Sequence, residues 1–421
     1  MTSRANDGKE DAWSTSVNGR LARLVFAILW PVLALVPAHA AAQQPPDPST
    51  TARMRVGPLA LTPTISVSNF GIDTNVFNNF EDPRQDFTTT LSPQTQFWLR
   101  LGRGRLSGTT ELNYVHYKTY ATERALNTRN EARLELPFNR ITPYVSETFI
   151  NARERPGYEI DARARRLENT LMLGTDVRVG AKSFVGLALW RTKTRFGANE
   201  IFLGTSLSDG LNRTDDGVRL SLRRKLTPLT TFVIDAEAQR DRFELSPVRN
   251  SDSVRIMPGV NFDPFALITG SARVGYRKYD ALGPGAPSYK GLVASADLGY
   301  TLLGATRVSV HTERDIAYSY DVAEPYYLQT GVSGTLTRKI TSRWDVQLTG
   351  GRYQLDYQQV AAIGLGAGQI DNVRTIGGGI GYTLRPGRRL GVNVDKYRRR
   401  SDRQTREYNA TRIGASLSYG F

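Results

Sequence analysis

The sequence of 421 residues contains no cysteine, only three histidines and no long apolar run after residue 40. Without cysteine the chain forms neither disulfides nor thiolate metal sites, and three dispersed histidines do not make a metal centre. A helix that spans a membrane needs about 20 apolar residues, which excludes a helical membrane domain beyond the N-terminal segment. Phosphate-loop, zinc-protease and serine-hydrolase motifs are also missing. We therefore expect no cofactor, no metal and no enzymatic activity.

The N-terminal segment has the order of a secretory signal. Arg20 and Arg23 precede the apolar run 24–37, and Ala38 and Ala40 occupy the two positions that a signal peptidase reads. The run is shorter than the roughly 20 residues of a spanning helix. We predict cleavage after Ala40; an uncleaved anchor is the alternative.

Three segments follow from the composition. We predict a signal peptide over residues 1–40, a Pro-rich periplasmic lead-in over 41–58 and a β-sheet domain over 59–421. The last of these alternates apolar and polar residues, as the stretch 87–101 (FTTTLSPQTQFWLRL) illustrates. Successive side chains of a strand point to opposite sides, so such strands have one apolar and one wet face.

Short turn signals recur along this domain at intervals of about forty residues, which fits one long β-hairpin per interval. They are LGRGRL, PFNRIT, RVGAKS, RRKLTPL, NFDPFAL, LLGATR, TRKITSR and LRPGRRL. Nine hairpins predict an all-β fold: a transmembrane, antiparallel, up-and-down β-barrel of 18 strands, with 16 as the alternative count. A propeller with a similar repeat would need four short strands per repeat and a blade signature, and the sequence has neither.

Aromatic residues lie at the ends of the predicted strands, which predicts two girdles at the two membrane interfaces. Those beside the short turns are Phe138, Phe262, Tyr300, Tyr382 and Tyr419. Those at the other strand ends are Tyr114, Tyr117, Tyr120, Tyr276, Tyr279, Tyr318, Tyr326, Tyr353, Tyr397 and Tyr408. Tyr419 and the terminal Phe421 also resemble the C-terminal signal that the barrel-assembly machinery reads.

The net charge is +15, and most of the excess lies in the eight short turns. A basic soluble protein would suggest nucleic acid, but a chain exported to the outer membrane does not meet it. We favour contact between the basic turns and anionic phospholipid head groups. Attraction of anionic solutes to the channel mouth and docking of a periplasmic partner remain as alternatives.

The strand phase places a nearly balanced set of charges on the wet face. Cross-strand ion pairs are the simplest interpretation, and a selective constriction is the alternative. Inward tryptophans suggest a surface on which sugar rings could stack. The candidate pore-lining residues are Arg100, Arg129, Arg133, Arg166, Arg219, Arg255, Arg273, Arg277, Arg307, Glu131, Glu135, Glu168, Asp235, Glu237, Trp98 and Trp190.

The motif GIDTNVFNN at 71–79, followed by DFTTTLSPQ, RLGRGRLSG and VHYKTYATERALNTRNEARLEL, resembles the putative beta-barrel porin type two family. The resemblance implies an outer-membrane barrel, often encoded near exopolysaccharide genes, with no catalytic residues to carry over. It also implies a role in polysaccharide export or surface assembly as one function to consider.

We predict a passive outer-membrane channel for hydrophilic solutes, with both termini in the periplasm. The alternatives are the exit barrel of an exopolysaccharide secretion system and a plugged barrel with a structural or surface-interaction role. Expected partners are outer-membrane lipid and lipopolysaccharide, the assembly machinery, and polysaccharide or periplasmic secretion components. The longest predicted loop, 195–217, either folds inward as a constriction or stays outside as a contact surface.

Overall fold

The computed structural model describes residues 52–264, 266–360 and 368–420. The predicted signal peptide 1–40, its cleavage residues Ala38 and Ala40, and Phe421 lie outside this part. By their internal contacts, residues 45–179 and 183–421 form one compact unit, which is described by itself below; residues 1–44 and 180–182 group separately. No helix in the described ranges combines the length and the hydropathy needed to span a bilayer.

Eighteen long strands make up the described part of this unit. The first nine are β2 (Leu59–Asp73), β3 (Asp86–Leu101), β4 (Gly104–Tyr117), β5 (Ala125–Glu135), β6 (Ile141–Glu154), β7 (Ala164–Arg178), β8 (Ser183–Phe196), β11 (Arg213–Thr227) and β12 (Thr230–Phe243). The second nine are β13 (Ser251–Phe262), β14 (Ile268–Ala281), β15 (Tyr289–Leu302), β16 (Thr306–Tyr318), β17 (Tyr326–Lys339), β18 (Trp344–Gln358), β19 (Ile370–Arg385), β20 (Arg388–Ser401) and β21 (Tyr408–Gly420).

Shorter elements occupy the connections. Strand β1 (Met54–Val56) folds back on the start of β2, and β9 (Ile201–Phe202) pairs with β10 (Thr205–Ser206). The one described α-helix, α2, spans Leu207–Leu211. Short 3-10 turns η2 (Ala121–Glu123), η3 (Pro247–Arg249) and η4 (Gln404–Arg406) complete the set.

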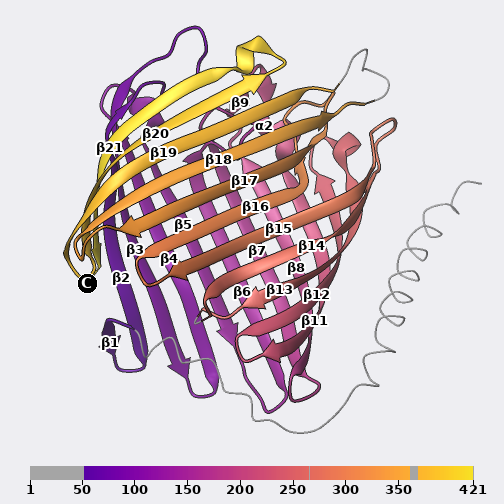
Figure 1. The fold of residues 1–421 in the computed structure, drawn as a ribbon. Coiled ribbons are helices and arrows are strands. Elements are labelled where there is room, and N and C mark those ends of the chain that lie inside the picture. The colour runs from indigo at the N-terminus through magenta and orange to yellow at the C-terminus, as the bar shows by residue number, and fades with distance from the viewer. Residues whose placement is uncertain (1–51, 265, 361–367, 421) are drawn as a thin grey trace, which may run out of the picture. The chain divides into compact units, whose positions relative to one another are not determined.

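Each long strand pairs in antiparallel fashion with the next long strand along the chain, and β21 pairs with β2 to close the ring. Figure 1 shows neighbouring strands tilted together around this unit. Closure leaves no unpaired sheet edge, as a membrane-spanning sheet requires. The predicted fold class and the count of 18 strands are therefore confirmed.

The connections alternate between short and long, and all eight short turns lie where the sequence predicted them. The β3–β4 and β19–β20 turns rely on Gly102 and Gly387, whose φ angles are +60° and +82°, a region that only glycine enters without strain. The longer loops of the described ranges collect at the opposite end, hereafter the loop end; the short turns form the turn end.

The two faces of the strands differ in the way that a lipid-exposed barrel requires. On β8, Leu189 is 54% exposed, whereas its neighbour Ala188 is 4% exposed. On β19, Ile376 points outward and is 67% exposed. Large apolar side chains exposed on almost every strand would be unfavourable in water, but they fit a hydrocarbon surface.

One part of the aromatic prediction is wrong. Trp344 on β18 and Tyr382 on β19 lie in contact on the outer face at the turn end, with ring centroids 4.8 Å apart. At the loop end, however, Tyr279, Tyr326 and Tyr353 are almost completely buried. Tyr353 is covered by Tyr158 of the loop between β6 and β7, and Tyr279 packs against Tyr318 and Tyr326. Most loop-end tyrosines therefore do not form a lipid-facing girdle; Tyr114 and Tyr276 are the exposed exceptions.

The lipid-facing assignment predicts an asymmetric response to added charge. Leu189→Arg places a guanidinium on the outer face near the middle of β8, and should lower the free energy of unfolding in lipid vesicles by about 2–4 kcal/mol. The control Gln96→Arg adds the same charge to the inner face of β3, and should change it little. Urea titration monitored by tryptophan fluorescence measures both; equal losses would contradict the assignment.

Candidate functional site

A short loop between β6 and β7, residues 155–163, crosses the lumen at the loop end. Its Tyr158 stacks on Tyr353 of β18, with ring centroids 3.9 Å apart and planes 24° apart. Strand β18 is the ninth strand from β7 in either direction around the ring of eighteen, and so lies directly opposite. We call residues 155–163 the crossing loop.

Buried arginines hold the backbone of the crossing loop on the far wall. Arg399 of β20 donates to the carbonyl oxygens of Tyr158 and Glu159, both at 3.0 Å, and pairs with Asp161 at 2.7 Å. Arg406 of η4 donates to the Glu159 carbonyl at 2.9 Å. These bonds satisfy loop carbonyls that have no strand partner, and so they offset the free-energy cost of burying the loop backbone.

Asp371 completes this cluster from β19. Its carboxylate forms ion pairs with both Arg399 and Arg406, and all three side chains are almost completely buried. Buried charges of this kind are tolerated only when they are paired and hydrogen-bonded. Removal of one member would leave the others uncompensated.

The carboxylate of Glu159 is held by the loop between β16 and β17. Ser319 Oγ donates to it at 2.6 Å and the Tyr320 amide donates at 3.2 Å. Arg249, from η3, donates in turn to the carbonyl oxygens of Ser319 and Tyr320. Burial raises the pKa of Glu159 to about 7, although Ser319 and the nearby Arg406 favour its ionised form.

The longest connection, between β8 and β11, also folds inward and packs against the crossing loop. Its Phe202, Leu207 and Leu211 pack in one buried cluster with Ile160 of the crossing loop and with Tyr320. The sequence drew attention to 195–217 because of its length. The structure assigns the crossing to the shorter segment 155–163.

Farther down the lumen, an ion-pair network runs along the inner wall from β11 to β16. Glu237 on β12 contacts Arg219 on one side and Arg255 on the other, the latter at 2.5 Å. Asp315 of β16 contacts Arg255 at 2.8 Å and Arg277 at 2.6 Å. The cross-strand register Arg219–Glu237–Arg255 brings these side chains together directly.

Other predicted lumen residues form smaller pairs. Arg273 contacts Asp235 at 2.9 Å, across β13. Three further arginines pair with a glutamate two residues along the same strand: Arg129 with Glu131, Arg133 with Glu135, and Arg166 with Glu168, at 2.9, 2.7 and 3.4 Å. Arg100 and Arg307 are exposed near the turn end, without an ion pair in the described ranges.

The two predicted tryptophans have different surroundings. Trp190 lies against Gly217, where an added Cβ would be 2.0 Å from its Cζ2 atom, and the Arg219 guanidinium lies 5.3 Å from its ring centre. Its ring is therefore packed along the wall. Trp98 faces Ala60 and Ser107 on the neighbouring strands, near the turn end.

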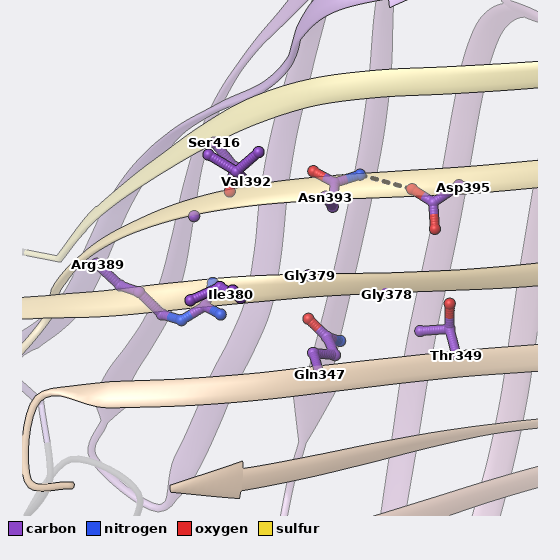
Figure 2. Close-up of a pocket in the computed structure, with 11 residues that line it drawn as sticks. Gln347, Thr349, Gly378, Gly379, Ile380, Arg389, Val392, Asn393, Asp395 and Ser416 are labelled. Carbon is purple, nitrogen blue, oxygen red and sulfur yellow. Dashed lines mark hydrogen bonds between the residues drawn. The ribbon is translucent and has the colours of Figure 1, made fainter. Parts of the chain in front are cut away.

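Two hollows open on the inner wall. One of about 460 Å³ lies beside the crossing loop and is lined by Tyr158, Arg163 and Arg412, with asparagines and threonines of β2 to β5. The other, of about 230 Å³, lies toward the turn end over the glycines of β19 (Figure 2), where Asn393 donates to Asp395 at 2.5 Å. Both offer hydrogen-bonding groups to small polar molecules.

Sequence reasoning missed the groups that organise the loop end: Tyr158, Glu159, Arg399 and Arg406. One signal was available for Arg399. In the run Arg398–Arg399–Arg400 the side chains alternate faces, so at least one arginine must point inward. Arg399 has no carboxylate two residues away on its own strand. Its acid partners come from other segments, which the sequence does not align.

The sequence matches the family model described as Putative beta-barrel porin 2 over residues 47–421. No curated protein matches it.

Three solved structures illustrate the similarity. Pseudomonas aeruginosa OpdK with vanillate is 9% identical, with a TM-score of 0.45, over 86% of this chain and 99% of that one. Pseudomonas aeruginosa OccK2 (OpdF) is 11% identical, with a TM-score of 0.46, over 86% and 98%. A BenF-like porin from Pseudomonas fluorescens Pf-5 is 10% identical, with a TM-score of 0.46, over 87% and 99%.

The raised pKa of Glu159 predicts that packing of the crossing loop depends on pH. The packed carboxyl, with a pKa of about 7 against an ordinary 4.5, binds more protons than the solvated one. Packing is therefore most stable below pH 4.5 and weakens as the pH rises through about 7. The free energy of local opening should fall by up to about 3 kcal/mol across this window.

Hydrogen exchange of amides 155–163, corrected for intrinsic rates, measures this effect between pH 5 and 8. Glu159→Gln should keep similar protection at both values, because its side chain does not titrate. The exposed control Glu81→Gln should retain the wild-type dependence. Equal wild-type protection at the two pH values would contradict the prediction.

Proposed function

The chain belongs to the putative beta-barrel porin 2 family and is an outer-membrane porin, and we propose that small hydrophilic solutes pass its lumen beside the crossing loop. The supporting observation is the closed ring of strands, apolar outside and charged inside, with a hollow of about 460 Å³ left next to residues 155–163. Passage needs no energy source, because solutes move down their own gradients through a wet channel.

We infer an orientation with the loop end outside the cell and both termini in the periplasm. Short turns face the periplasm in barrels of this kind, and longer loops face outward. The basic turns, which include Arg103, Arg140 and Arg343, would then meet anionic phospholipids of the inner leaflet. The assembly machinery would read the final strand, where Tyr419 lies against Arg388 with the guanidinium 4.4 Å from the ring centre.

The lumen favours small solutes over a polymer. A polysaccharide chain would have to pass the crossing loop, which the buried Arg399 and Arg406 fix to the far wall. The plugged barrel is the second candidate, and the same loop favours it. The two differ in whether the unmodified protein conducts ions.

The wall network suggests a weak preference for anions. Three guanidinium groups, Arg219, Arg255 and Arg277, share two carboxylates, Glu237 and Asp315. Within this network of five side chains, one positive charge is therefore left in excess. Rings or patches of one sign select ions of the opposite sign in channels.

Replacement of residues 156–162 by Gly-Ser-Gly should raise single-channel conductance about twofold or more, because the crossing loop no longer narrows the lumen. Planar-bilayer recording of refolded protein measures it. The control replaces 282–288, a loop between β14 and β15 outside the crossing contacts. Unchanged conductance in the first variant would show that the crossing loop does not narrow the channel. A wild-type barrel that conducts no ions until 156–162 is replaced would instead support the plugged barrel.

Glu237→Gln should shift the reversal potential in a salt gradient toward anions, raising the anion-to-cation permeability ratio about twofold. The substitution keeps the side-chain shape and removes the charge shared by Arg219 and Arg255. Glu81→Gln, on the exposed β2–β3 loop, is the charge-matched control. A shift toward cations, or the same shift in the control, would refute a selective role for the network.

A further inference from the structure

The outer face of β18, β19 and β20 carries four arginines at the loop end. Arg352, Arg374 and Arg398 lie directly opposite one another on the three adjacent strands, and Arg400 follows one outward position later. All four are exposed, and with Asn372 they line a hollow of about 170 Å³. We call these four residues the arginine ladder.

The ladder has no acidic partner within the described residues. Within those residues, the side-chain hydrogen bond of the ladder runs from Arg352 to Asn372, at 3.4 Å. Asp402, two residues beyond Arg400, accepts from the Ile370 amide at 2.8 Å. The next outward carboxylate on β18 is Asp356, four residues or about 13 Å beyond Arg352 along the strand. Like charges directly opposite on neighbouring strands are destabilising, so this arrangement calls for an anion.

On strand β20, arginines of the outer face lack ion-pair partners, whereas the arginine of the inner face has them. Arg399 points inward, is fully buried, and pairs with Asp161 and Asp371. Its neighbours Arg398 and Arg400 point outward and have no such partners. The chain therefore neutralises the inward arginine from within and leaves the outward ones to their surroundings.

The ladder lies at a membrane interface. Trp344 and Tyr382 mark the turn-end interface on β18 and β19. Trp344 precedes Arg352 by eight positions and Tyr382 follows Arg374 by eight positions, which is about 26 Å along each strand. With a strand tilt of about 40°, this separation is about 20 Å along the membrane normal, somewhat less than the apolar band of about 25 Å. Exposed Leu348, Ile376 and Val394 occupy the band between them.

We propose that the arginine ladder binds the phosphate groups of lipopolysaccharide in the outer leaflet. Guanidinium groups bind phosphate oxygens in bidentate fashion, and three in a row fit a head group that carries more than one phosphate. The apolar band directly below accommodates the acyl chains of the same molecule. The inference rests on the orientation given with the proposed function, since only an outward loop end brings the ladder to that leaflet.

The test measures binding of bisphosphorylated lipid A to the full-length mature protein in detergent, by native mass spectrometry. Arg374→Gln/Arg398→Gln should weaken binding about tenfold or more, because at least two charge-assisted hydrogen bonds are lost. The control Arg191→Gln/Arg240→Gln removes the same charge from the outer face at the loop end, where both arginines flank Asp216 in register. It should bind as the wild type does.

Three other probes identify the chemistry. Removal of the phosphates from lipid A should weaken its binding to the wild type at least as much as the double substitution weakens binding of bisphosphorylated lipid A. Inorganic pyrophosphate should not displace the lipid at equal concentration, and phosphatidylglycerol should bind more weakly. Wild-type affinity in the double variant, full displacement by pyrophosphate, or equal binding of phosphatidylglycerol would each overturn the proposal.

Failure of the proposed function would be visible separately. The ladder lies outside the lumen, so the double variant should keep wild-type conductance, and a silent barrel that still binds lipid A would refute only the channel. Orientation is tested with Leu245→Cys, an exposed loop position in a chain without native cysteine. Labelling on intact cells by an impermeant maleimide supports the outward loop end; no labelling, in a protein that folds and binds lipid A, refutes the orientation and with it the site's access to lipopolysaccharide.

Discussion

Every backbone amide and carbonyl of a strand that meets hydrocarbon needs a partner on a neighbouring strand. This constraint fixes the architecture, because only a sheet closed on itself leaves no edge. The pairing of β2 with β21 is therefore the contact on which the fold depends, although it joins residues from the two ends of the domain. Once the ring is closed, each strand must show one face to lipid and the other to the lumen.

The same constraint explains the chemistry of the crossing loop. A segment without a strand partner that enters the lumen must find donors for its carbonyl groups, and the wall supplies them as arginines. Arg399 and Arg406 serve the carbonyls of Tyr158 and Glu159, while Asp371 balances their charge. The loop is positioned by electrostatics and hydrogen bonds from strands on the far side, with an apolar cluster around Ile160 behind it.

Charge is treated differently on the two faces of one sheet. Inward charges are largely paired within the protein, as Glu237 and Asp315 pair with the arginines around them. In the described part of the chain, the outward arginines of β18 to β20 form no ion pair, which leaves them available to the polar groups of the proposed membrane interface. Strand β20 contains both arrangements at adjacent residues: the inward Arg399 is paired within the protein, and the outward Arg398 and Arg400 are not.

The sequence by itself determined the strands, the turns, the number of hairpins and the face of most side chains, because alternation and turn chemistry are local properties. It also placed Arg219, Glu237 and Arg255 on one face, and their register then joined them. It did not identify the crossing loop or the partners of Glu159, Arg399 and Tyr353, and it misplaced several loop-end tyrosines. Those contacts join strands on opposite sides of the ring, and which segments face one another across a lumen is decided only when the ring closes.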